Sequence, residues 1–169
     1  MLIKRLIIGL GLLSLIIGFL LFQKLNHEPK ERHVHAGFQV YVDGKLQDFS
    51  EAKYMSLLLC EEENTHPKKT KERIQIEKAH LHHNVGDVVH SEREGAVWGD
   101  LFKNIKVEFD RSKRVEGYVN GKKITNIFDY PIKAYDSVVI FSGKIEEKLL
   151  KKAVTKKRIK EVEREGAEC

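Results

Sequence analysis

Residues 38–46 read Phe-Gln-Val-Tyr-Val-Asp-Gly-Lys-Leu, and this stretch decides the fold. Its apolar residues alternate with others, which is typical of a half-buried β-strand. Asp43-Gly44 is a signal for a two-residue type I′ turn, because both central positions of that turn need a positive φ. The chain then returns over 45–49. The stretch therefore predicts a β-hairpin that belongs to a larger sheet.

The first strand of this hairpin extends backwards through a pair of histidines. Side chains two residues apart on a strand share a face. The face that begins at Phe38 is then apolar throughout and contains Val34, Ala36, Phe38, Val40 and Val42. His33 and His35 lie on the opposite face. Both histidines are therefore predicted to face outward rather than into a core.

The rest of the chain predicts further strands and one short helix. Apolar spacing over 97–105 matches one face of a helix. Asn120-Gly121 marks a second hairpin, and the charged stretch 61–72 predicts an exposed loop. The further predicted strands occupy, in chain order, 74–82, 88–92, 106–110, 115–119, 122–124 and 137–141.

This order of elements resembles the β-grasp (ubiquitin-like) family, and most of all its small sulfur-carrier branch. That branch has a "VNGK" turn in its first hairpin, matched here by Val42-Asp43-Gly44-Lys45, and a later "VNG" turn, matched by Val119-Asn120-Gly121. Its last strand, "L-x-x-G-D-x-V-x-I", corresponds to 132–140. The resemblance covers 37–50 and 96–143. It implies an α+β fold with a β-grasp-like mixed sheet and one packed helix.

The resemblance implies a domain at 33–143 with a His-rich insertion at 51–95. Sulfur carriers end in a Gly-Gly tail, whereas this chain runs on past Gly143, so that activity is not carried over. The His-x-His strand followed by "F-x-V-Y-x-x-G", "H-L-H" and "V-V-H" is also similar to small membrane-anchored prokaryotic proteins. In that pattern a further histidine follows two positions after His90, where this chain has Glu92.

The amino-terminal segment predicts a membrane anchor. Residues 6–22 contain no charge and follow Lys4-Arg5. On a helix they rise about 25 Å, near the lower limit for a bilayer span. A cleavable signal peptide is the alternative, but no small-x-small cleavage site follows. The sequence therefore predicts an anchor at 1–23, a linker at 24–32, and a single-pass cell-membrane protein whose soluble domain is extracytoplasmic.

Residues 144–169 predict a charged helical tail, with the helix over 145–165. Nine Lys or Arg against five Glu in 144–165 account for most of the chain's net charge of +5. One interpretation is a solvated helix, and the other is a basic arm that binds a protein partner or anionic lipid. The basic residues alternate with Glu and lack aromatic neighbours, so no nucleic-acid partner is expected.

The histidines carry the main chemical prediction. All eight lie between His27 and His90, and two His-x-His pairs place imidazoles side by side on strands. Neutral imidazole is a common ligand of Zn(II) and Cu(II), and only two methionines occur, which argues against a Met-rich Cu(I) site. Glu92 shares a strand face with His90 and adds a carboxylate. The predicted metal ligands are His33, His35, His80, His82, His90 and Glu92.

The sequence thus predicts a membrane-anchored extracytoplasmic domain that binds Zn or Cu through clustered histidines. The alternative is a protein-interaction module that uses a sheet edge or the basic C-terminal helix, with incidental histidines. Neither His-Glu-x-x-His nor Gly-x-Ser-x-Gly occurs, so an enzyme is the less favoured interpretation. Cys60 and Cys169 leave pairing and free thiols equally open.

Overall fold

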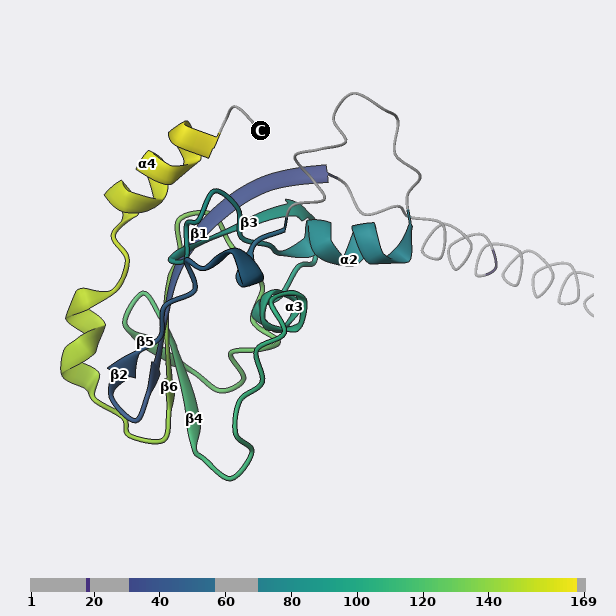
Figure 1. Ribbon diagram of the computed structural model, residues 1–169. Helices are drawn as coiled ribbons and strands as arrows, with labels where there is room; N and C mark the ends of the chain where they lie inside the picture. Colours follow the sequence, from purple (N-terminus) through teal and green to yellow (C-terminus); the bar gives the residue numbers. More distant parts are fainter. Residues whose placement is uncertain (1–17, 19–30, 57–69, 167–169) are drawn as a thin grey trace, which may run out of the picture. The chain divides into compact units, whose positions relative to one another are not determined.

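The computed structural model describes residue 18 and residues 31–56 and 70–166. The chain divides into two units, Met1–Lys30 and Glu31–Cys169, and every element described below belongs to the second. This second unit is a mixed α+β structure built on a six-stranded sheet (Figure 1).

The sheet has the strand order β2-β1-β6-β4-β5, and β3 pairs with β1 outside this path. Among the paired strands of the described chain, β1 and β6 run parallel, and the other pairs are antiparallel. The strands are β1 (Glu31–Val42), β2 (Lys45–Leu46), β3 (Val88–Arg93), β4 (Val115–Val119), β5 (Lys122–Ile124) and β6 (Ser137–Ser142). In the described chain, the helices are α2 (Lys71–Lys78), α3 (Trp98–Asn104), α4 (Lys156–Glu165) and the 3-10 helices η1 (Ala52–Tyr54) and η2 (Glu147–Lys152).

Both predicted hairpins are confirmed. Asp43 and Gly44 have φ values of 50° and 82°, and Asn120 and Gly121 have 50° and 79°. Two successive positive φ angles are the signature of the type I′ turn, whose twist matches that of the flanking strands. The first turn joins β1 to β2 and the second joins β4 to β5.

Strand β1 is long enough to pair with two strands along the same edge. Its C-terminal end pairs with β2, and its N-terminal half pairs with β3. On the other edge, Gly37 to Val42 pair with β6. This arrangement places the His33-Val34-His35 segment beside β3, away from the hairpin that the sequence identifies most clearly.

The main core lies between the sheet and α3. Phe38 is 1% exposed and its ring lies 5.9 Å from Trp98 and 6.2 Å from Phe102, measured between centroids. The predicted inward face of β1 is confirmed, since Val34, Ala36, Phe38 and Val40 all belong to this cluster. The helix predicted over 97–105 is likewise confirmed as α3.

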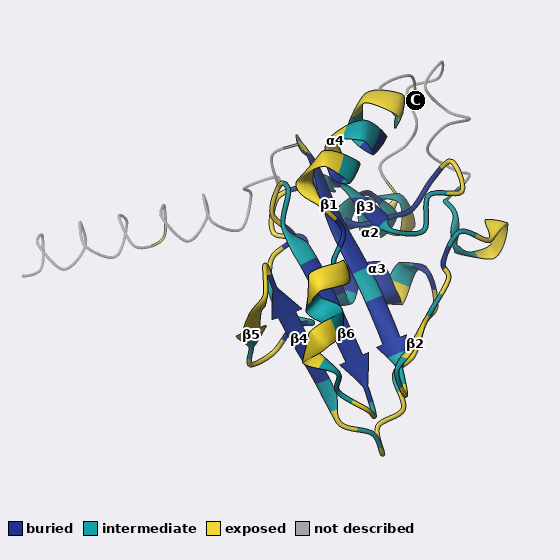
Figure 2. Ribbon diagram, turned by 90° about the vertical axis from the view of Figure 1, so that its left-hand side faces the viewer, coloured by how far each residue is buried: buried dark blue, intermediate teal, exposed yellow. Residues whose placement is uncertain are grey.

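The opposite face of the sheet is covered by η2 and α4, as Figures 1 and 2 show. Ile159 and Val162 of α4 are buried with Val154 and Val88. A Cβ on Gly37 would lie 2.6 Å from the Cβ of Val154, so only glycine lets this segment approach β1 so closely. The Arg158 guanidinium contacts both carboxylate oxygens of Asp87, at 3.2 Å each.

Several sequence predictions are corrected here. The strand predicted over 74–82 is wrong for 74–78, which lie in α2. This helix begins after Thr70, whose side chain accepts a hydrogen bond from the Arg73 N–H. His80 and Leu81 form isolated bridges to His90 and Met55. Residues 106–110 form no strand. The tail predicted as one charged helix over 145–165 is instead divided into η2 and α4, and apolar side chains of both helices pack on the sheet.

The predicted fold class and localisation are corrected as well. The prediction was one packed helix behind a transmembrane segment, whereas helices pack on both faces of the sheet. In the described ranges, no helix is both long and apolar enough to cross a membrane. The ten residues of α4 rise about 15 Å, half of the ~30 Å hydrocarbon core. This finding overturns the prediction of a single-pass membrane protein; the stretch 6–22 on which it rested lies, except for residue 18, outside the described residues.

The resemblance to the β-grasp family stays a prediction. So do the expected partners, a protein or anionic lipid at the C-terminal helix and no nucleic acid. The apolar side of α4 is used internally, which leaves its charged side exposed (Figure 2).

Candidate metal centre

Strand register places three histidines in a row. His35 of β1 is the direct partner of His90 of β3, and an isolated bridge makes His80 the partner of His90 on the other side. The backbone of His80 and His90 exchanges two hydrogen bonds, of 2.9 and 3.0 Å. Directly opposed residues carry their side chains on the same face, so the register itself brings the imidazoles together.

His90 lies at the centre of this group. Its ring stacks on that of His35 with centroids 4.5 Å apart and an interplanar angle of 10°. The rings of His80 and His82 lie 4.9 and 5.1 Å from it. His33 approaches from the exposed side, where its Nδ1 lies 3.3 Å from the His90 Nε2.

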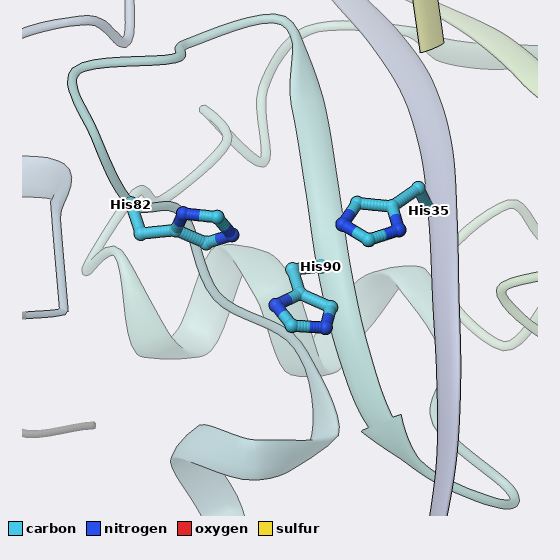
Figure 3. Close-up of side chains that lie close together, drawn as sticks. All are labelled: His35, His82 and His90. Carbon is cyan, nitrogen blue, oxygen red and sulfur yellow. The ribbon is translucent and has the colours of Figure 1, made fainter. Parts of the chain in front are cut away.

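Two sets of side chains in the described residues have ligand atoms close enough to hold a metal ion. The first set is His35, His82 and His90, shown in Figure 3, and the second is His80, His90 and Glu92. Within each set the ligand atoms lie within 4.8 Å of one another. In Figure 3, the three rings of the first set converge from β1, β3 and the segment that precedes β3.

A left-handed turn follows His82 and changes the predicted arrangement. His83 and Asn84 have φ values of 54° and 56°, so the chain leaves the strand path there. The Nδ1 of His83 lies 3.0 Å from the Nδ1 of His82. A Cβ on Gly166, just after α4, would lie 3.0 Å from the His82 Cε1. The end of α4 therefore closes over this imidazole.

Burial keeps these histidines neutral. His80, His35 and His82 are 3%, 8% and 8% exposed. Burial, together with a smaller effect of neighbouring histidines, lowers the pKa of His80 to about 3, of His82 to about 4 and of His90 to about 2. Burial also lowers the pKa of His35, against the opposing effect of Glu163. A neutral imidazole has a free lone pair, which is the form that binds metals.

The supports of the centre include a buried ion pair. Glu77 of α2 accepts a 2.6 Å hydrogen bond from Nε of Arg93 on β3, and Arg73 contacts the same carboxylate at 2.8 Å. His80 follows α2 directly, and its Nδ1 lies 3.2 Å from the Ile76 carbonyl oxygen. A donor Nδ1–H at this contact directs the other nitrogen of His80 toward the cluster.

Five of the six predicted ligands fall into two overlapping sets rather than one, namely His35, His80, His82, His90 and Glu92. His33 belongs to neither set but contacts His90. The prediction that the histidines of β1 face outward is wrong for His35, because α4 covers it. His27 and His66, which the sequence places in linkers, lie outside the described residues.

Sequence reasoning missed Glu163 of α4, whose Oε1 lies 3.6 Å from the His35 Nδ1. It also missed Tyr135, whose hydroxyl donates a 2.9 Å hydrogen bond to Oε2 of Glu163. No signal in the sequence connects these residues with His35, because the contact depends on how α4 packs. The spacing of Ile159 and Val162 on one helix side was the nearest available indication that this segment docks.

No protein-family model, curated protein or solved structure matches this chain. The interpretation of the centre therefore rests on its own geometry and chemistry.

Proposed function

We propose that this protein binds one transition-metal ion, Zn(II) or Cu(II), through His35, His82 and His90. One observation carries the proposal: three imidazoles from three separate chain segments converge with their ligand atoms within 4.8 Å of one another. Two of the three are more than 90% buried. Three histidine nitrogens are an established ligand set for zinc, with a further position left for another ligand.

The energetics of the cluster support the same function. Burying a polar group without a good partner costs roughly 1–3 kcal/mol. His35 and His90 stack closely, and the Nδ1 of His35 has no hydrogen-bond partner among the described residues. A bound cation would satisfy several of these ring nitrogens at once, so the arrangement favours a metal-bound state over the metal-free one.

The donor atoms favour Zn(II) and Cu(II) over other ions. Imidazole nitrogen suits both ions, whereas Mg(II) and Ca(II) prefer oxygen ligands. His80 and Glu92 provide further donors beside the shared His90, and His33 approaches from the exposed side. These three residues are candidates for the remaining coordination position.

Calorimetric titration of the purified protein with Zn(II) and with Cu(II) tests the proposal. We expect saturable binding near one ion per chain and its loss in His90→Gln, because His90 belongs to both sets. Gln keeps a polar side chain of similar size, and circular dichroism checks that the variant folds. His66→Ala, in the predicted loop, is the matched histidine control. Equal binding by His90→Gln and the unaltered protein would refute the proposal.

A further inference from the structure

The buried ring nitrogen of His35 faces a carboxylate from the C-terminal helix. His35 Nδ1 has no hydrogen-bond partner among the described residues. Oε1 of Glu163 lies 3.6 Å from it, slightly beyond a hydrogen bond. In Figure 3, the other ring nitrogen of His35 is on the side of the ring that faces His82 and His90. The two nitrogens of this one imidazole are thus divided between the carboxylate and the candidate metal position.

Glu163 is held in place by its own contacts. Its second carboxylate oxygen accepts the 2.9 Å hydrogen bond from the Tyr135 hydroxyl. Tyr135 in turn donates its backbone N–H to the carbonyl oxygen of His35, at 2.8 Å. Tyr135 has a φ of 63°, a left-handed conformation that costs a non-glycine residue of order 1 kcal/mol or more. A strained residue therefore joins both ends of the His35–Glu163 pair.

The helix that carries Glu163 is itself fixed to the sheet. Ile159 and Val162 are 0% and 3% exposed, and Arg158 pairs with Asp87 just before β3. Glu163 retains 38% exposure of its side chain, whereas the His35 side chain retains 9%. The Glu163 carboxylate is thus partly exposed at the surface and contacts the buried imidazole of His35. Its position is fixed because α4 packs on the sheet.

A carboxylate in this place has a definite effect on a metal ligand. An acceptor at Nδ1 holds the proton there, fixes the tautomer and leaves the Nε2 lone pair for the ion. It also fixes the ring orientation and raises the basicity of the ligating nitrogen. Loss of such a partner typically lowers metal affinity by about 10–100-fold.

We propose that Glu163 is a positioning residue for the metal centre: its carboxylate accepts a hydrogen bond from the Nδ1–H of His35 and directs the other nitrogen at the ion. This inference rests on the proposed function and adds α4 to the site. It assigns a role to a residue of the segment 144–169, for which the sequence predicted only a charged helical tail.

Three variants of the full-length protein test the inference, with Co(II) and Zn(II) as probes. Glu163→Ala removes the acceptor, and Glu163→Gln keeps an acceptor oxygen without the charge. Glu161→Ala, also on α4, is the matched control, because Glu161 pairs only loosely with Lys157 at 3.9 Å. Calorimetry gives the Zn(II) affinity, and the visible absorption of bound Co(II) reports ligand geometry.

We expect Glu163→Ala to weaken Zn(II) binding about 10–100-fold and to change the Co(II) spectrum. Glu163→Gln should restore part of the affinity, and Glu161→Ala should match the unaltered protein. A purely structural role would not produce rescue by Gln together with a spectral change. If the unaltered protein binds metal and Glu163→Ala binds it equally with the same spectrum, this inference alone fails. If the unaltered protein binds neither ion, the proposed function fails and the inference fails with it.

Discussion

The two faces of strand β1 reach burial by opposite means. On one face Val34, Ala36, Phe38 and Val40 pack against α3 and its neighbours with at most 4% exposure. On the other face His35 is almost equally buried, but its neighbours are other histidines and the carboxylate of Glu163. The apolar face is stabilised because folding removes its side chains from water. The histidine face loses hydration, and under the proposed function a bound cation replaces the lost interactions.

This difference means that the two faces should respond to different perturbations. Truncation of a large side chain should damage the apolar face whether or not metal is present. Metal, pH and the docking of α4 should act on the histidine face and leave the apolar face unchanged. The four predictions that follow test this separation.

The largest effect is expected on the apolar face, from Phe38→Ala. Phe38 is 1% exposed and lies between Phe49, Trp98 and Phe102. Removing a buried phenylalanine ring typically costs about 3–5 kcal/mol. Urea unfolding should show this loss both with and without Zn(II). A change below ~1 kcal/mol would show that the core is assigned to the wrong face.

The second effect is stabilisation by metal. Zn(II) at about 100 times its dissociation constant should raise the unfolding free energy by roughly 2.7 kcal/mol. His90→Gln should abolish this increment, because it removes the residue common to both ligand sets. Thermal unfolding with and without Zn(II) measures it, and Phe38→Ala should retain the increment despite its lower starting stability. An undiminished Zn(II) increment in His90→Gln would contradict the account.

The third effect is a pH dependence of the metal-free protein. The pKa of His82 is about 4, of His80 about 3 and of His90 about 2 in the folded state, all below the usual 6.5. As the pH falls below 6.5, the unfolded chain takes up protons first, so stability is full above that pH. It is lost progressively toward the folded pKa values, at about 1.4 kcal/mol per pH unit for each histidine.

Urea unfolding at pH 7.5, 6.5 and 5.5 measures this slope. The loss should be small between the first two values and steeper between the last two. His90→Gln removes one of the contributing histidines and should reduce the slope. A stability that is level across this range would mean that the histidines are solvated.

The smallest effect is expected from Thr155→Ala. The Thr155 side chain accepts a hydrogen bond from the Arg158 N–H at the start of α4. Loss of such a cap costs about 0.5–2 kcal/mol. Hydrogen exchange should show faster opening of α4 while α3 stays protected, because only the histidine face depends on this helix. Equal loosening of both helices would show that the two faces unfold as one unit.

Local signals explain which parts of the fold could be predicted. The two turns at Asp43-Gly44 and Asn120-Gly121 need positive φ angles, and the residues there supply them. Alternation along β1 identified its apolar face. The alternation at Ile74 and Ile76 led to a wrong strand prediction. These residues belong to α2, which begins after Thr70 and contacts α3 through the hydrogen bond from Asn104 to the Gln75 carbonyl oxygen. Periodicity over so few residues does not separate a strand from a helix.

Only those parts of the candidate site that depend on residues close together in the sequence could be predicted. His33 with His35, and His80 with His82, follow from i, i+2 spacing. The convergence on His90 depends on which strands pair, and Glu163 is brought to His35 by the packing of Ile159 against the sheet. Such contacts between distant segments arise from tertiary structure, which composition and spacing do not encode. The same limit explains why His35 was expected to be exposed.

The most direct test of the central claim is to observe the imidazole nitrogens during a Zn(II) titration by two-dimensional ¹H–¹⁵N NMR. We expect the ring signals of His35, His82 and His90 to shift together and to saturate near one ion per chain, with the signals of His66 unchanged. Shifts that do not saturate, or that appear only at histidines other than these three, would contradict a metal centre on this face of β1.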